Sequence, residues 1–201
     1  MTSAPVMPVM VIEHLEHAVP LAKALVAGGL PVLEITLRTP CALEAISAIK
    51  AAVPGAIVGA GTVNTPELLD AAVAAGSDFL VSPGSTPALI DKALAVGVPM
   101  LPGVCTPSEA MALLERGISR MKFFPAEAAG GVDMLKSIYG PLPQIKFCPT
   151  GGINLAKAPS YLALPNIACV GGSWIAPKDL VEAGKWDEIT ALAAEAAALA
   201  N

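Results

Sequence analysis

The residue best able to do chemistry is Lys122, which lies beside apolar residues in the segment of residues 120–127. This segment is predicted to form a short buried strand that ends at Pro125. Burial strips water from an ammonium group and favours the neutral amine, which is the form that attacks a carbonyl group to make a Schiff base. Two structural alternatives are a lysine that reaches solvent at the strand end and a lysine paired with a structural carboxylate.

A second predicted strand, residues 32–37, alternates apolar and polar residues, and its polar set is Glu34, Thr36 and, just beyond the strand, Arg38. If helices cover the outer face of the sheet, this set must point into the interior of a barrel, where it needs partners or a ligand. A structural contact between Glu34 and Arg38 is one alternative. Because Lys122 is expected in the same interior, two cations and one carboxylate leave room there for an anionic ligand.

Paired glycines follow the last two predicted strands, in Gly151-Gly152 and in Gly171-Gly172-Ser173. Glycine lets backbone N–H groups approach an anion closely, and a following helix start adds positive potential. In a (β/α)8 barrel the loops after strands seven and eight are the usual phosphate site. The two pairs therefore predict a phosphate site, with plain turns as the alternative.

Other strand ends offer weaker signals. Thr62 is placed to present a hydroxyl group at the mouth of a barrel, although a turn also explains the Gly-x-Gly before it. Residues 82–84, which include Pro83, are small and keep the mouth open.

Lys146 is a competing nucleophile, but its strand neighbours offer no polar partner and it can reach solvent at the strand end. Lys122 is therefore the preferred nucleophile.

Short apolar runs alternate with alanine-rich amphipathic segments along the chain, which is typical of strand–helix units in a parallel sheet. About eight units predict a (β/α)8 (TIM) barrel, formed by residues 1–201 as a single α/β domain. A doubly wound open sheet is the alternative, weakened because no Gly-x-Gly-x-x-Gly follows the first strand. Besides the strand of Lys122, strands are predicted at residues 6–12, 32–37, 57–60, 79–82, 100–101, 145–148 and 167–170. Helices are predicted at residues 15–27, 41–52 and 177–199 and after the N-cap residues of three Thr-Pro pairs, Thr65, Thr86 and Thr106.

Composition excludes several classes of protein. Hydrophobic residues make up 54% of the 201 residues and charged residues only 14%, which excludes disorder. No apolar run is long enough for a membrane span, and the first residues do not have the pattern of a signal peptide. The net charge of −5 argues against a nucleic-acid partner, and the sparse charge favours an oligomer that buries apolar faces.

Neither the cysteines nor the histidines predict a metal site. His14 and His17 are three positions apart, a spacing at which two histidines could bind one metal ion. The chain contains no other histidine to complete such a site, so an exposed helix end is the favoured interpretation. The cysteines have neither metal-ligand nor redox spacing, so buried reduced thiols in a cytoplasmic protein are expected. The four cysteines are Cys41, Cys105, Cys148 and Cys169.

Six segments together resemble the family of 2-keto-3-deoxy-6-phosphogluconate (KDPG) aldolases, in order and with similar spacing: residues 33–39, 59–63, 82–84, 122–127, 147–152 and 171–174. The resemblance implies a class I lyase of the Entner–Doudoroff pathway that cleaves KDPG to pyruvate and glyceraldehyde 3-phosphate. In many bacteria such enzymes also cleave 4-hydroxy-2-oxoglutarate (KHG) to pyruvate and glyoxylate. The resemblance further implies a homotrimeric barrel in the cytoplasm, without a metal or organic cofactor. This sequence departs from the family in one respect. Family members usually carry a helix before the first strand, whereas here the first predicted strand already begins at Val6, so stability or assembly is expected to differ.

The resemblance implies a role for each matching residue. Lys122 would form the Schiff base, and Glu34 would act as the general acid and base. A sugar-phosphate isomerase or epimerase barrel is one competing function, but it would need a carboxylate base and no strand lysine. An engineered trimeric scaffold derived from an aldolase is another, against which the retained Lys122 argues. The binding residues implied are Arg38 and Thr62 for the pyruvyl carboxylate, Pro83 and Phe124 for the pocket wall, and Gly151, Gly152, Gly172 and Ser173 for the phosphate.

Overall fold

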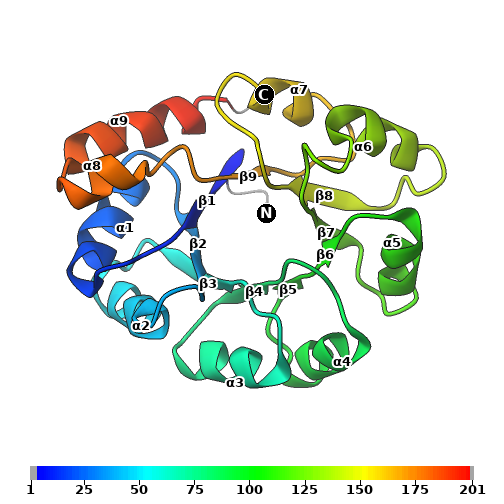
Figure 1. Ribbon diagram of the computed structural model, residues 1–201, viewed down its shortest axis with the longest axis horizontal. Helices are drawn as coiled ribbons and strands as arrows, with labels where there is room; N and C mark the ends of the chain where they lie inside the picture. The colour runs from blue at the N-terminus through cyan, green and yellow to red at the C-terminus, as the bar shows by residue number, and fades with distance from the viewer. Residues whose placement is uncertain (1–3, 200–201) are drawn as a thin grey trace.

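The computed structural model describes residues 4–199, in which parallel strands form a ring and helices surround it (Figure 1). Strand and helix alternate along the chain, as the sequence pattern predicts. The strands are β1 (Val6–Met10), β2 (Val32–Thr36), β3 (Ile57–Gly61), β4 (Phe79–Val81), β5 (Met100–Leu101), β6 (Gly103–Val104), β7 (Arg120–Phe123), β8 (Lys146–Pro149) and β9 (Val170–Gly172).

Helices occupy the outside of the ring, and three of them begin as the Thr-Pro pairs predict. The side chains of Thr65, Thr86 and Thr106 each accept a hydrogen bond from a backbone N–H in the first helical turn, which confirms all three N-caps. The helices are η1 (a 3₁₀ turn, Leu15–His17), α1 (Ala18–Ala27), α2 (Ala42–Ala52), α3 (Pro66–Ala74), α4 (Pro87–Val96), α5 (Pro107–Leu114), α6 (Gly131–Tyr139), α7 (Ala158–Leu162), α8 (Lys178–Glu182) and α9 (Trp186–Ala197).

The ring consists of a six-stranded sheet, β5-β4-β3-β2-β1-β9, and a three-stranded sheet, β6-β7-β8. Pro102 joins the two sheets, because Leu101 before it pairs with β4 and Gly103 after it pairs with β7. Proline has no N–H to donate to a strand ladder, but its carbonyl accepts from the Lys122 N–H at 2.9 Å. β5 and β6 are thus one interrupted barrel strand, and the (β/α)8 barrel is confirmed in place of the open sheet.

The other junction closes the ring between β8 and β9, and here the predicted strand at residues 167–170 is wrong. Ile167 makes only an isolated bridge to Phe147, whereas Val170 pairs with Val6 of β1 and its N–H donates to the Pro5 carbonyl just before that strand. The chain changes neighbours between these two positions, so the regular strand starts at Val170. A second isolated bridge, between Thr150 and Gly171, completes the junction.

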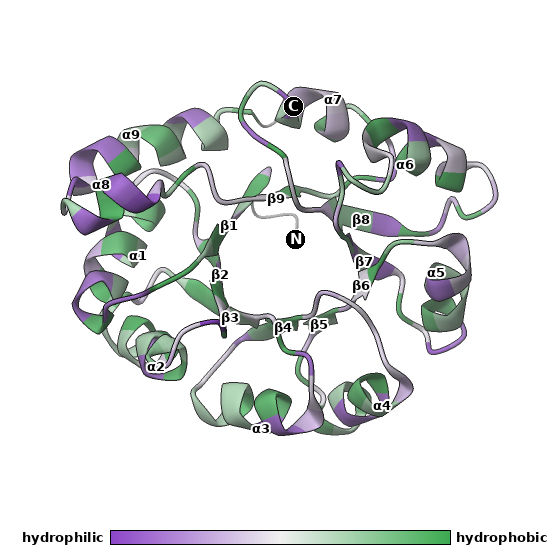
Figure 2. Cartoon of the chain, in the orientation of Figure 1, coloured by the Kyte–Doolittle hydropathy of each residue, from purple (hydrophilic) through white to green (hydrophobic). Residues whose placement is uncertain are grey.

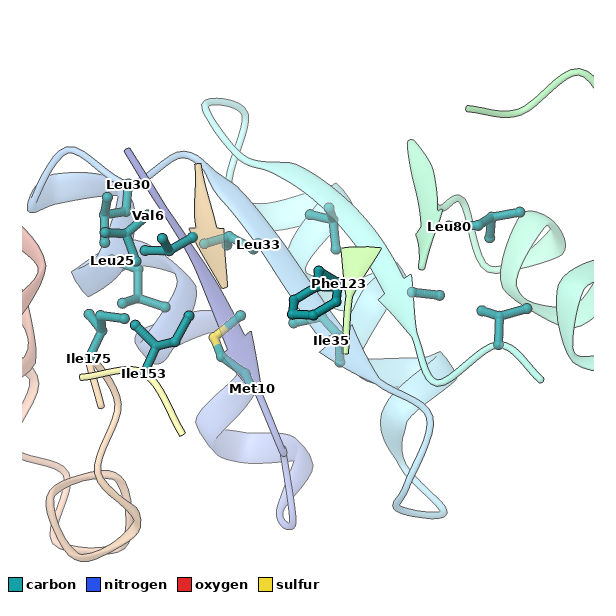
Figure 3. Close-up of a cluster of buried hydrophobic side chains, with 14 of the residues drawn as sticks. Val6, Met10, Leu25, Leu30, Leu33, Ile35, Leu80, Phe123, Ile153 and Ile175 are labelled. Atoms are coloured by element: carbon teal, nitrogen blue, oxygen red, sulfur yellow. The ribbon is translucent and has the colours of Figure 1, made fainter. Parts of the chain in front are cut away.

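The main core lies between the strands and the helices. Leu33 and Ile35 of β2 and Phe123 of β7 are fully buried in it (Figure 3), and the strands are largely apolar along their length (Figure 2). A separate small cluster, formed by strand or strand-flanking residues alone, contains Cys148 and Cys169. Among the described residues, no helix has both the length and the apolar character needed to cross a membrane.

Candidate active site

A cavity of about 320 Å³ opens where the strands end and the chain passes into the following loops. Its position follows from the parallel sheet, because the carboxyl ends of all the strands meet on one side of the barrel. All ten residues predicted for the site line this cavity: Glu34, Arg38, Thr62, Pro83, Lys122, Phe124, Gly151, Gly152, Gly172 and Ser173.

Lys122 and Glu34 contact each other inside the cavity. The Lys122 Nζ donates to the Glu34 Oε1 at 3.1 Å, and their side chains are only 7% and 1% exposed. The second carboxylate oxygen of Glu34, Oε2, is buried and accepts no hydrogen bond from any described residue. A proton can therefore pass along one hydrogen bond between the amine and the carboxylate, while Oε2 remains available to a ligand.

Glycine on the neighbouring strand makes room for this carboxylate. Gly61 of β3 pairs with Thr36 of β2, and a Cβ atom at Gly61 would lie only 2.2 Å from the Glu34 Oε1. Thr36 itself is satisfied within the fold, since its hydroxyl donates to the Met10 carbonyl at 2.8 Å. Thr36 therefore ties β2 to β1, and Glu34 is the member of the polar set that faces Lys122.

The alternative of a structural contact between Glu34 and Arg38 is not present, because the partner of Glu34 is Lys122. Arg38 follows the end of β2, where its N–H turns back to the Thr36 carbonyl at 2.8 Å. The Arg38 side chain is exposed and forms no ion pair with a described carboxylate, which leaves its guanidinium free for an anionic ligand.

Thr62, immediately after β3, has a φ of 62°, in the left-handed region that β-branched residues rarely adopt. Such strained backbone conformations concentrate at functional sites because the surrounding structure must enforce them. The sequence placed Thr62 at the mouth of the barrel but contained no signal for this conformation. Phe124 covers the amine, with Lys122 Nζ 5.5 Å from its ring centroid.

The predicted phosphate residues form the other end of the cavity. Gly151 and Gly152 have φ values of 107° and 77°, so the loop after β8 requires glycine at both positions. In β9, a Cβ atom at Gly172 would lie 1.7 Å from the Trp174 ring. Glycine at these positions brings two backbone segments to the cavity edge without side chains in the way.

Five further residues line the cavity: Val9, Thr36, Thr150, Ile153 and Gly171. The sequence placed Thr36 inside the barrel and Gly171 in a glycine pair of the predicted phosphate site, but it gave no role to Val9, Thr150 or Ile153. Val9 and Thr150 could have been found from strand alternation, because Val9 lies two positions beyond Met7 and Thr150 two positions beyond Cys148, both members of the small strand cluster. Ile153 lies in an irregular loop, where no periodicity exists to read.

The competing lysine, the two histidines and the cysteines do not line this cavity. Lys146 is exposed and donates to the Pro165 carbonyl at 2.5 Å, so it does not line the cavity. His14 is exposed and His17 half-buried, and residues 4–199 contain no group of histidine, cysteine or carboxylate side chains fit to hold a metal. Cys148 is a buried free thiol, and its pKa is raised by the adjacent Cys169 thiol and by burial.

The expectation of buried thiols is confirmed for Cys148 and Cys169, which are free and buried. It is wrong for Cys41 and Cys105, which are half-buried. Cys41 lies at the start of α2, where its thiol donates to the Ile12 carbonyl at 3.2 Å.

The chain is similar in sequence to known proteins over nearly its whole length. A family model described as KDPG and KHG aldolase matches residues 1–192. The 2-dehydro-3-deoxy-phosphogluconate aldolase of Dickeya dadantii is 56% identical over 198 residues, covering 98% of this chain and 93% of the relative. The KHG/KDPG aldolase of Escherichia coli K12 is 54% identical over 196 residues, covering 98% of this chain and 92% of the relative.

A solved structure is similar over the same extent. The KDPG aldolase of Legionella pneumophila, whose crystal structure holds pyruvate as a covalent carbinolamine captured at low pH, superposes with a TM-score of 0.96 at 49% identity. The match covers 98% of this chain and 95% of the Legionella chain.

Proposed function

Because the chain belongs to the KDPG and KHG aldolase family, we propose that it cleaves KDPG to pyruvate and glyceraldehyde 3-phosphate through a Schiff base on Lys122. It is a class I aldolase, and KHG is its second substrate, cleaved to pyruvate and glyoxylate. The observation that carries the residue assignment is the contact at 3.1 Å between a buried lysine and a buried carboxylate inside the cavity. A carboxylate-dependent isomerase would have no use for the amine.

The pair performs each proton transfer of the reaction. Glu34 takes a proton from Lys122, and the neutral amine attacks the C2 ketone of the substrate to form a carbinolamine. Glu34 then protonates the departing hydroxyl group, and loss of water leaves an iminium ion. This cation accepts the electron pair of the C3–C4 bond while Glu34 takes the C4 hydroxyl proton, so that glyceraldehyde 3-phosphate leaves and an enamine remains. Protonation of the enamine and hydrolysis of the imine release pyruvate and regenerate Lys122.

The remaining lining residues hold the substrate. Arg38 and Thr62 bind the carboxylate next to the ketone, because a free guanidinium and a hydroxyl are suited to a carboxylate. Pro83 and Phe124 form the wall of the pocket. Binding both ends of the substrate fixes the reacting carbon atoms beside Lys122 and converts remote binding energy into orientation. The phosphate is bound by Gly151, Gly152, Gly172 and Ser173.

The working form is a homotrimer in the cytoplasm, in which residues 1–201 of each subunit form one domain. Large apolar side chains that remain exposed in the single chain support an oligomer, among them Leu94 and Met111, which are 50% and 53% exposed. Light scattering should give a mass of about three times the 20.3 kDa of one chain. A monomer in dilute solution would refute the trimer but leave the chemistry unaffected.

The chemistry is tested by reducing the protein with borohydride in the presence of pyruvate and mapping the adduct by mass spectrometry. We expect one pyruvyl adduct on Lys122, none after Lys122→Ala, and an unchanged adduct in the control Lys146→Ala. Glu34→Gln should lower turnover of KDPG on the order of 10²- to 10⁴-fold, the usual contribution of a general acid or base. An unmodified folded protein, or an adduct on Lys146, would refute the assignment of Lys122.

A further inference from the structure

The loop that follows Lys122 lies directly against the proposed phosphate loop. The Ala126 N–H donates to the Thr150 carbonyl at 2.8 Å, and the Glu127 N–H donates to the Gly151 carbonyl at 3.1 Å. Two backbone hydrogen bonds therefore link the segment after β7 to the segment after β8.

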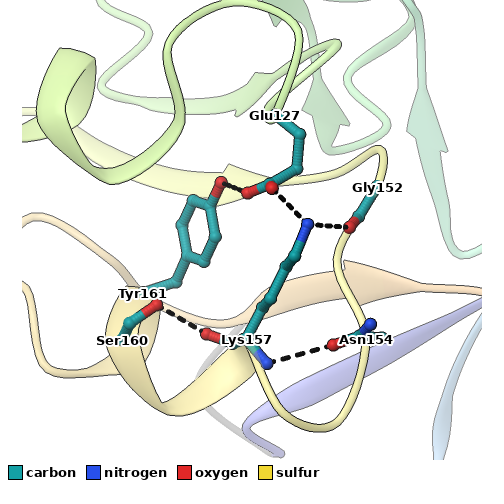
Figure 4. Close-up of polar contacts among 6 residues, drawn as sticks. All are labelled: Glu127, Gly152, Asn154, Lys157, Ser160 and Tyr161. Atoms are coloured by element: carbon teal, nitrogen blue, oxygen red, sulfur yellow. Dashed lines mark hydrogen bonds and ion pairs between the residues drawn. The ribbon is translucent and has the colours of Figure 1, made fainter.

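The Glu127 side chain extends this link to the next residue of the phosphate loop (Figure 4). One carboxylate oxygen accepts from the Tyr161 hydroxyl, and the other accepts from the Lys157 Nζ at 2.5 Å. The same Nζ donates to the Gly152 carbonyl at 3.4 Å. Gly152 packs on the carboxylate stem so closely that a Cβ atom there would lie 2.7 Å from the Glu127 Cγ.

These contacts determine which way the peptide groups of the loop face. In a planar trans peptide the carbonyl of one residue and the N–H of the next point in opposite directions. The Gly151 carbonyl accepts from the Glu127 backbone N–H and the Gly152 carbonyl accepts from the Lys157 Nζ, so the N–H groups of Gly152 and Ile153 point to the opposite side. Neither N–H donates to an acceptor in the described chain, and both residues line the cavity.

We propose that Glu127 is a positioning residue for substrate phosphate: its N–H holds the Gly151 carbonyl, and its carboxylate holds Lys157 on the Gly152 carbonyl, so that two free N–H groups face the anion. This role rests on the proposed function. It also explains why a carboxylate is tolerated beside an anion site, since Lys157 neutralises its charge. Glu127 does not line the cavity, and its side chain bonds to Lys157 and Tyr161, so it acts through the loop.

The test separates binding of the phosphate from chemistry at the amine. Glu127→Gln keeps an acceptor for Tyr161 but removes the ion pair with Lys157, and Lys157→Met removes the cation. Each variant should raise the KM for KDPG about tenfold, on the scale of one lost charged hydrogen bond. Exchange of pyruvate methyl protons with deuterium oxide, followed by NMR, needs no phosphate and should stay unchanged in both.

The double variant provides the sharper comparison. Because both side chains act through one link, Glu127→Gln with Lys157→Met should raise the KM little more than either change alone. Lys92→Met, which breaks an exposed ion pair with Asp70 between α3 and α4, is the matched control and should leave the KM unchanged. If Glu127→Gln fails to fold, Tyr161→Phe removes only the hydroxyl donor and should raise the KM about threefold.

Two results would overturn the inference alone: an unchanged KM in both single variants, or a fall in pyruvate exchange equal to the fall in KDPG cleavage, which would indicate general damage. Absence of pyruvate exchange in the unsubstituted protein would overturn the proposed function together with this inference. The two failures are therefore distinguishable in the same set of measurements.

Discussion

Gly61→Ala should move the Glu34 carboxylate although neither Glu34 nor Lys122 is itself replaced. The added methyl group would lie 2.2 Å from the Glu34 Oε1 and 2.7 Å from its Cγ. Non-bonded heavy atoms normally approach to about 3.5 Å, so the carboxylate must recede by more than about 1 Å. Gly61 does not have a positive φ, so alanine fits the backbone and the crowding falls on the side chain alone.

That displacement breaks the contact on which proton transfer depends, because Oε1 is the atom that accepts from the Lys122 Nζ at 3.1 Å. A misplacement of about 1 Å at a reacting group lowers the rate on the order of 10²-fold. We therefore expect kcat for KDPG, followed through pyruvate release, to fall about 100-fold while borohydride still traps pyruvate on Lys122.

The matched control for this change is Gly140→Ala at the end of α6. Its backbone is already helical, and the nearest atom to an added Cβ would be 4.0 Å away. This control should keep full turnover. If Gly61→Ala retained turnover within about twofold of the unsubstituted enzyme while staying folded, the crowding argument and the need for the carboxylate at its present place would both be refuted.

Two further predictions concern stability. Thr106→Ala removes a capping box in which Thr106 and Glu109 exchange hydrogen bonds at 2.8 and 3.3 Å, and urea unfolding should show a loss of about 1 kcal/mol that Thr106→Ser largely restores. Hydrogen bonds from Lys157 and Tyr161 lower the pKa of the Glu127 carboxyl group in the folded protein. The contribution of Glu127 to the free energy of unfolding should therefore be complete above about pH 5 and should decline as the pH falls through the lowered folded-state pKa. Urea titrations of the unsubstituted protein and Glu127→Gln between pH 7 and pH 3 should show their difference in unfolding free energy shrinking toward acid, and a constant difference would contradict the assignment.

Local rules account for much of what could be predicted. Each Thr-Pro pair specifies a helix start by itself, because the cap and the fixed proline φ act within one turn. Alternation along β2 placed Glu34 inside the barrel, since successive strand residues face opposite sides. These signals depend only on neighbouring residues, and the structure agrees with them.

The failures come from long-range pairing and from strand ends. Whether the segment around Ile167 pairs with β8 or with β1 is decided by residues far away in sequence, so the short apolar run misplaced β9. Arg38 lies where the chain turns back on itself, and alternation no longer applies there, so the sequence alone could not decide against the alternative contact with Glu34. The ion pair of Glu127 with Lys157, which supports the phosphate loop, joins residues 30 positions apart and has no local pattern.

The interruption at Pro102 divides the barrel into two arcs, and the chemistry is divided with it. The three-stranded arc carries Lys122 and leads into the loop of Gly151, whereas the six-stranded arc carries Glu34. The proposed nucleophile and base therefore belong to different sheets and meet only across the closed ring. Neither arc alone carries both groups, so we expect an opening of the ring at the Pro102 or β8–β9 junction to separate them. Catalytic activity is thus a direct reporter of ring closure.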